Sequence, residues 1–91
     1  MSRYLATYDI GDNRRRRRVA RVLQEYGQRI QWSVFEVDLE PQEVAELRSR
    51  LGPVLGKKDA FEIIPIDATG NRKRYRWQRP VETRESVIVI N

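Results

Sequence analysis

Apolar and polar side chains alternate over residues 3–10, which read RYLATYDI. A period of two is the pattern of a β-strand, and the polar Asp9 stands near its end. The turn sequence GDN follows, and either Asp12 or Asn13 can cap a helix there. We therefore expect a strand, a turn and a helix in the first part of the chain.

After this turn, apolar residues recur at intervals of three and four, which is the spacing of one helix face. Gly27 is expected to end this helix, because glycine commonly follows the last helical residue. Most of the five consecutive arginines, residues 14–18, fall off the apolar stripe. The stripe consists of Val19, Val22, Leu23 and Tyr26.

Residues 28–39 are rich in β-forming side chains, but their alternation changes phase near Ser33. This change predicts either a bulge or two short strands joined by a kink. Pro41 marks the start of a second helix, since proline is favoured at the first helical position, and Gly52 marks its end. The buried face expected for this helix comprises Val44, Ala45, Leu47 and Leu51.

Three patterns follow in the C-terminal third. Residues 60–67 predict a strand, which Pro65 places at a sheet edge or gives a bulge. A turn is expected at residues 69–71 and a weakly alternating segment at residues 72–78. Residues 86–90, SVIVI, predict an apolar strand that needs a sheet edge to join, in its own chain or in a neighbour.

The predicted order β-α-β(β)-α-β, with extra C-terminal strands, indicates an α/β sandwich with helices on one sheet face. The length of 91 residues favours one domain, residues 1–91, with a core of about residues 1–67. Residues 68–91 would form a C-terminal hairpin and terminal strand. So short a chain has a modest core and no cysteine for a disulfide, so oligomerisation is the common stabilising device that remains.

The net charge of +5 is spread unevenly. Residues 1–31 hold eight Arg and Lys against three Asp and Glu, residues 32–60 four against six, and residues 61–91 six against four. Arginine far outnumbers lysine, and its planar guanidinium suits bidentate contacts with phosphate. The leading inference is a polyanionic partner, namely nucleic acid; the alternative is charge that only keeps the protein soluble.

Absent residue types exclude several chemistries. The chain has neither histidine nor cysteine, which removes imidazole acid–base catalysis, Ser-His and Cys-His nucleophiles, and zinc sites built from these residues. A bound metal would be a hard, oxygen-ligated cation such as magnesium. With no apolar run near the ~20 residues of a membrane span and no signal pattern at the N-terminus, a cytoplasmic location is expected.

Several segments, taken in order, resemble a known family. The run YLATYDIGDNRRRRRVARVLQEYGQRIQWSVFEVDL, followed by EPQE and FEIIPID, is similar to the small ferredoxin-like nuclease-fold subunit of CRISPR spacer acquisition, which accompanies the integrase subunit. The resemblance runs from about Tyr4 to Asp67 and continues loosely to the terminal strand, whereas residues 68–84 carry no family signature. It implies a ferredoxin-like βαββαβ sandwich.

The resemblance also implies what the protein assembles with and does. Family members are homodimers whose C-terminal strand packs on the partner's sheet. They are described as metal-dependent nucleases acting on RNA or double-stranded DNA, and as the scaffold between integrase dimers that holds the DNA to be inserted into a CRISPR array. The dimer residues would be Val87, Ile88, Val89 and Ile90.

Asp9 carries the family's acidic position, as catalytic residue and metal ligand. One carboxylate is a sparse ligand set, but two copies of Asp9 meeting across a dimer axis could hold one magnesium ion and polarise a water for attack on phosphorus. The alternative is that Asp9 only terminates the strand or caps the next helix. Tyr8 points to the opposite sheet face, so packing is its expected role.

Helix geometry divides the basic residues. Arg15 leans toward the apolar stripe, while Arg14, Arg17, Arg18 and Arg21 share one face. Phosphate binding is favoured over a merely solvated face, because so many like charges repel unless an anion neutralises them; Arg16 and Arg18 match the family's basic positions. The predicted nucleic-acid-binding residues are Arg14, Arg16, Arg17, Arg18, Arg21 and Arg29, with Tyr8, Ser33 and Phe35 as accessory residues.

A second basic segment, residues 72–79, interleaves with Tyr75 and Trp77, which suits nucleic acid and an exposed hairpin equally. The preferred function is a homodimeric scaffold that binds duplex DNA and joins integrase subunits for spacer acquisition. A magnesium-dependent endonuclease is the enzymatic hypothesis. The alternative is a stand-alone RNA-binding module or a toxin-like endoribonuclease of similar fold.

Overall fold

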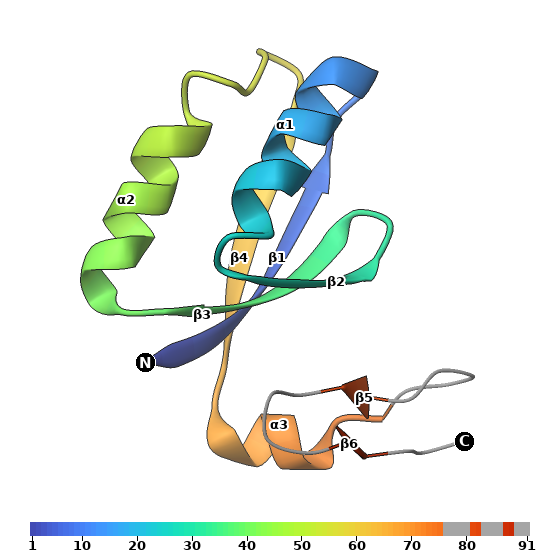
Figure 1. Ribbon diagram of the computed structural model, residues 1–91, viewed down its shortest axis with the longest axis vertical. Coiled ribbons are helices and arrows are strands. Elements are labelled where there is room, and N and C mark those ends of the chain that lie inside the picture. Colours follow the sequence, from blue (N-terminus) through green and yellow to red (C-terminus); the bar gives the residue numbers. More distant parts are fainter. Residues whose placement is uncertain (76–80, 83–86, 89–91) are drawn as a thin grey trace.

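The computed structural model describes residues 1–75, 81–82 and 87–88 of the chain. Its elements are, in chain order, β1 (Ser2–Asp9), α1 (Asn13–Leu23), β2 (Gly27–Gln31), β3 (Val34–Leu39), α2 (Pro41–Leu51), β4 (Ala60–Ile66), α3 (Ala68–Lys73), β5 (Val81–Glu82) and β6 (Val87–Ile88). A four-stranded antiparallel sheet has the order β2-β3-β1-β4, and β5 pairs with β6 in a separate ladder. The first six elements therefore have the predicted ferredoxin-like βαββαβ order (Figure 1).

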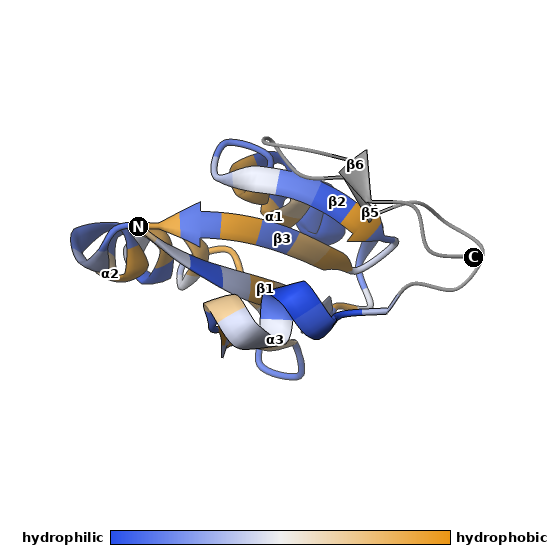
Figure 2. Ribbon diagram, turned by 90° about the horizontal axis from the view of Figure 1, so that it is seen from below, coloured by the Kyte–Doolittle hydropathy of each residue, from blue (hydrophilic) through white to orange (hydrophobic). Residues whose placement is uncertain are grey.

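Strand β1 is the centre of the sheet, because it pairs with β3 on one side and with β4 on the other. Ala6 lies opposite both Phe35 and Ile63 in this register. Alternate strand residues face α1 and α2, which lie over the same sheet face; Figure 2 shows the alternation along β3. The buried core comprises Ala6, Tyr8, Ile10, Val19, Ala20, Leu23, Tyr26, Phe35, Val37, Leu39, Leu47 and Leu51.

The phase change near Ser33 is explained by a hairpin. Strands β2 and β3 are joined by a turn at Trp32 and Ser33, and their register shifts between Arg29 and Gln31. The prediction of two short strands is therefore correct, but a hairpin turn joins them rather than a kink, and the irregular pairing lies at Arg29–Gln31 rather than at Ser33. The consequence is that Trp32 stands at the hairpin tip rather than in a strand.

Gly27 does not end the first helix, contrary to the prediction. Helix α1 ends at Leu23 with Gln24 as its cap, and Gly27 is the first residue of β2, opposite Val37. A Cβ at Gly27 would lie 1.9 Å from the carbonyl oxygen of Glu36. Glycine is needed here because two backbones approach closely, not because a helix terminates.

The cap of α1 is one of the two residues predicted from the sequence, and the start of α2 at Pro41 is as predicted. Asp12 is the N-cap of α1 and accepts a hydrogen bond from the Arg15 backbone N–H at 2.9 Å. Glu40 and Glu43 form a capping box at the start of α2. The predicted buried face of α2 is correct for Leu47 and Leu51, is half-buried at Val44, and is wrong for Ala45, which is exposed.

The turn predicted at residues 69–71 is wrong. These residues belong to α3, which Asp67 caps by accepting the Gly70 N–H at 2.6 Å. Residues 72–73 of the predicted weak strand also lie in α3, and residues 76–78 lie outside the described residues. In the terminal strand, Val87 and Ile88 pair with β5, whereas Val89 and Ile90 lie outside the described residues.

An ion-pair network holds the segment after α3 against the sheet face that α1 and α2 leave open. Glu36 is 4% exposed, and its carboxylate forms ion pairs with Arg3 at 3.0 Å and with Arg74 at 2.8 Å. Arg3 also bonds Asp38 at 3.0 Å. A buried carboxylate requires such partners, because an unpaired buried charge is strongly destabilising. No helix in the described part of the chain has the length and apolar character needed to cross a membrane.

We predict that Gly27→Ala lowers the free energy of unfolding by about 1–3 kcal/mol, because the added methyl group must displace the β3 backbone. Urea unfolding followed by circular dichroism measures the change. Gly11→Ala is the matched control, since nothing lies within 4 Å of a Cβ there, and it should change stability by no more than about 0.5 kcal/mol. Equal effects of the two substitutions would contradict the close-approach explanation.

Candidate nucleic-acid interface

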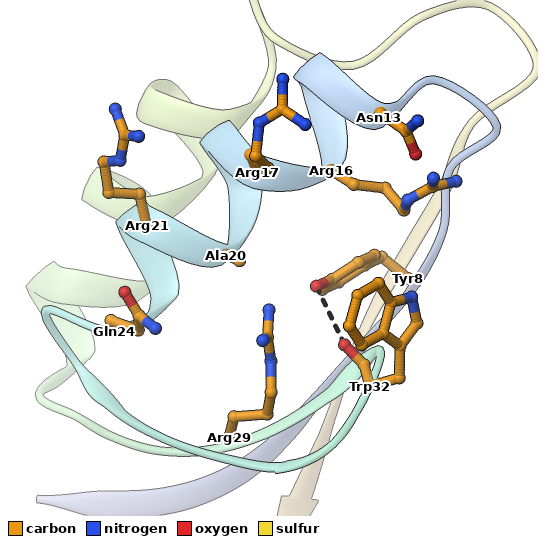
Figure 3. Close-up of a pocket in the computed structure, with 9 residues that line it drawn as sticks. All are labelled: Tyr8, Asn13, Arg16, Arg17, Ala20, Arg21, Gln24, Arg29 and Trp32. Carbon is orange, nitrogen blue, oxygen red and sulfur yellow. Dashed lines mark hydrogen bonds between the residues drawn. The ribbon is translucent and has the colours of Figure 1, made fainter.

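A basic groove lies between α1 and the β2–β3 hairpin (Figure 3). Its volume is about 460 Å³. Of the residues in the described part of the chain that line it, four are arginines and none is aspartate or glutamate. We call this the arginine groove; its lining residues are Tyr8, Asn13, Arg16, Arg17, Ala20, Arg21, Gln24, Arg29 and Trp32.

The geometry of α1 decides which arginines reach the groove. With 3.6 residues per turn, successive arginines point about 100° apart. Arg16, Arg17 and Arg21 line the groove, whereas Arg14 and Arg18 are exposed and are not among its lining residues. The shared face predicted from the sequence is therefore only partly correct. Arg17 and Arg21 line the groove as a pair, but Arg16 joins them instead of Arg14 and Arg18.

Two groove arginines are held in place by contacts of their own. The Nη1 of Arg16 donates to the carbonyl oxygen of Ile10 at 2.7 Å, just beyond the end of β1. The guanidinium of Arg29 lies 5.4 Å from the ring centre of Trp32 and 5.1 Å from that of Phe35, which are cation–π distances. These contacts fix one arginine of the helix and one of the hairpin in the lining of the same groove.

Arg15 does not line the arginine groove and instead forms an ion pair within the fold. Its Nε donates to Asp59 at 2.8 Å, and Asp59 also accepts the Gly56 N–H at 2.7 Å. The hydrogen bond from Arg15, followed by that from Gly56, holds the pKa of Asp59 below its usual value. This pair fastens the first turn of α1 to the loop before β4, and agrees with the expectation that Arg15 leans inward.

Asp9 lies exposed in the last position of β1, opposite Ala60 of β4. It borders a separate cavity of about 350 Å³, together with Thr7 and Glu62. The described residues contain no cluster of three or more Asp, Glu, His or Cys that could hold a metal. Asp9 and Glu62 contribute carboxylates to the lining of this cavity. Asp9 does not cap α1, because Asp12 does.

The three accessory residues occupy the junction of β1 with the hairpin. Tyr8 is 7% exposed and Phe35 is fully buried, with their ring centres 6.3 Å apart. The Tyr8 backbone N–H donates to the carbonyl of Ser33 at 3.2 Å, and its hydroxyl donates to the carbonyl of Trp32 at 3.4 Å. Ser33 therefore lies near Asp9 and contacts the residue before it through the backbone.

The basic segment at residues 72–79 is only partly described. Arg74 pairs with Glu36 and also donates to the side chain of Asn71 at 3.0 Å, so its charge is used within the fold. Arg72 and Lys73 are exposed on α3, and Arg76 and Arg79 lie outside the described residues. Arg74 is thus removed from the set of residues that suit phosphate binding.

The sequence pattern missed Trp32 as a groove residue. Its place among apolar residues suggested a strand, but 72% of it is exposed at the hairpin tip. The phase change at Ser33 was the one signal that a turn begins there. Asn13 and Gln24 were also missed, because polar residues on an arginine-rich helix carry no distinctive pattern.

Comparison with known proteins identifies the family. The family model described as CRISPR associated protein Cas2 matches residues 1–74. The chain belongs to the Cas2 family. The CRISPR-associated endoribonuclease Cas2 3 of Synechocystis sp. is 37% identical over 88 residues, which cover 96% of each chain. The CRISPR-associated endoribonuclease Cas2 of Nitratidesulfovibrio vulgaris is 39% identical, over 94% of this chain and 91% of its own. The resemblance inferred from the sequence is confirmed.

Solved Cas2 structures have the same fold. The crystal structure of Streptococcus pyogenes Cas2 at pH 6.5 superposes with a TM-score of 0.76 at 30% identity, over 82% of this chain and 98% of that one. A chain of the partial Cas6-RT-Cas1–Cas2 complex has a TM-score of 0.76 at 22% identity, over 84% of each chain, a likeness of fold alone. The arrangement of β1, α1 and the hairpin is therefore a Cas2 arrangement.

We predict that Asp59→Asn destabilises the protein at neutral pH, because Arg15 then loses its charged partner. Asp59 has a lower pKa when folded than its ordinary 3.8, so the unfolded chain binds its proton first as the pH falls. The stability contributed by Asp59 is thus complete above about pH 4 and is lost as the pH falls through the folded pKa.

Urea unfolding of wild type and Asp59→Asn from pH 7 down to pH 3 tests this. The two curves should differ most near pH 7 and converge in acid. Glu62→Gln removes the same charge from an exposed position and serves as the matched control. A constant difference at every pH would show that Asp59 acts without its charge.

Proposed function

We propose that this Cas2-family chain is the duplex-binding scaffold subunit of a CRISPR spacer-acquisition complex. The observation that carries the proposal is the arginine groove, which Arg16, Arg17, Arg21 and Arg29 line with no carboxylate among the described lining residues. Guanidinium groups so placed bind phosphate oxygens and release counterions from the duplex. Such contacts supply affinity without reading sequence, which is what a scaffold for varied spacers needs.

The proposed assembly is a cytoplasmic homodimer that joins integrase subunits. The open sheet face carries Leu5, Ile64 and Ile66, and Ile64 is 42% exposed. An apolar sheet face that the chain itself covers incompletely favours a second copy. The terminal strand around Val87 and Ile88 is the element expected to pack on the partner's sheet. A chain of the same fold occurs in a partial Cas6-RT-Cas1–Cas2 complex, which supports a Cas1 integrase as partner.

We predict that Arg17→Ala or Arg21→Ala weakens duplex DNA binding by about tenfold, because each removes a charge-assisted bond to phosphate. The slope of log K against log salt should flatten by about 0.9 for each phosphate that is no longer neutralised. Fluorescence anisotropy with a labelled blunt duplex, measured over a range of salt, checks both. Arg48→Ala, an exposed arginine of α2 outside the groove, is the control. Equal weakening in all three variants would refute a groove-centred interface.

The second candidate is a magnesium-dependent endonuclease centred on Asp9. The names of the relatives, CRISPR-associated endoribonuclease, and the cavity shared by Asp9, Thr7 and Glu62 favour it. Asp9 from each of two subunits would hold the ion, and Glu62 would bind one of its waters. The bound ion supplies a Lewis acid for a phosphodiester. Asp9 lies outside the arginine groove, so this activity and duplex binding rest on different residues.

We predict that Asp9→Asn abolishes magnesium-dependent cleavage of RNA and of double-stranded DNA, because the metal loses a charged ligand. Duplex binding in the absence of metal should stay within about twofold of wild type, as every arginine that binds phosphate is kept. A gel-based cleavage assay and a spacer-integration assay with the integrase subunit measure the two functions. Integration that fails in Asp9→Asn would contradict a scaffold role independent of catalysis.

A further inference from the structure

Trp32 buries little of its side chain, so it contributes little apolar burial to the stability of the folded chain. It is 72% exposed at the tip of the β2–β3 hairpin, although tryptophan is highly buried on average. Phe35, the aromatic residue that the sequence offered near this site, is fully buried and has no ring face open to a ligand. Trp32 is therefore the aromatic residue of the groove whose ring a ligand can reach.

The surroundings of Trp32 specify what that ligand carries. Arg29 reaches over the indole from the same hairpin, and Arg16, Arg17 and Arg21 stand on the facing helix (Figure 3). The lining of the groove thus includes four arginines and one largely exposed aromatic ring. Phosphates complement the arginines, and the π-face of a nucleobase complements the aromatic ring.

Within a duplex, neighbouring base pairs cover the faces of each base. Only an unpaired or terminal base has a face available for an indole, and stacking is possible for every base because each has a π-face. A groove that binds duplex phosphates alone would not need an exposed tryptophan. The volume of about 460 Å³ lies within the range of sites that enclose small ligands, about 300–1,000 Å³.

We propose that Trp32 is a base-stacking residue, so that the arginine groove selects nucleic acid in which an unpaired nucleotide adjoins a duplex. The unpaired base stacks on Trp32 while Arg16, Arg17 and Arg21 bind the phosphates on either side of it. This inference rests on the proposed nucleic-acid function and adds a preference for the form of the substrate. Both DNA and RNA present this chemistry.

The test uses the full-length protein with Trp77→Phe, which leaves Trp32 as its one tryptophan. Its fluorescence is titrated with a blunt duplex, with the same duplex carrying a short single-stranded overhang, and with that overhang made abasic. A DNA overhang and an RNA overhang form separate arms. Quenching by the base-containing overhang, and little by the abasic one, is the expected result, because only a base can stack on the indole.

Affinities of variants complete the test. Trp32→Ala should bind the overhang substrate about tenfold more weakly, while blunt and abasic duplexes change by less than about twofold. Trp32→Phe should retain most of the preference, because it keeps an aromatic face. Gln31→Ala, at an exposed neighbouring position outside the groove, is the matched control. Circular dichroism confirms that each variant is folded.

Three outcomes would overturn the inference. Equal weakening on all substrates would make Trp32 a general contact, and loss of preference in Trp32→Phe would exclude stacking. Unchanged binding to every nucleic acid, with weaker association to the integrase subunit, would reassign Trp32 to a protein interface. In each case duplex binding by Arg17 and Arg21 still stands. If the unmodified protein binds no nucleic acid at all, the proposed function fails with it.

Discussion

The rest of the structure depends on strand β1 forming hydrogen bonds along both of its edges. Pairing with β3 and β4 fixes the position of the end of β1 and the face that each of its side chains occupies. Tyr8 therefore lies in the core, while Asp9 is exposed beside β4. The same pairing brings the carbonyl of Ile10 under Arg16. The end of β1 thus contributes to two sites, because Tyr8 lines both the cavity beside Asp9 and the arginine groove.

The five arginines of residues 14–18 have different roles because a helix turns about 100° per residue. Arg15 pairs with Asp59 and fastens the helix to the loop before β4. Arg16 is bonded to the end of β1, and Arg17 faces the groove. Arg14 and Arg18 remain exposed. A run that looks uniform in sequence is therefore a set of residues with separate contacts, and this explains how so much like charge is accommodated on one short helix.

A second set of charges organises the opposite face of the sheet. Glu36 is buried on that face between Arg3 and Arg74, so the segment after α3 is tied to the strand that also carries Phe35 and Val37 into the core. This arrangement needs each partner, because removing one would leave a buried charge uncompensated. The arginine groove and this network lie on different sides of the sheet, so the two sets of arginines do not share contacts.

The sequence by itself determined the element order through β4, the start of α2 at Pro41 and the family, because these depend on local periodicity, turn chemistry and an ordered set of motifs. It limited the cap of α1 to Asp12 or Asn13, and β4 to an edge or bulged strand. It did not determine the reason for Gly27, the helical state of α3, the pairing of Arg15 with Asp59, or the exposure of Trp32. Gly27 is required by the close approach of the Glu36 backbone, the exposure of Trp32 follows from the hairpin register, and Arg15 and Asp59 are 44 residues apart in the chain. Only the tertiary structure decided which arginines face a common groove, because strand pairing sets where the helix and the hairpin meet.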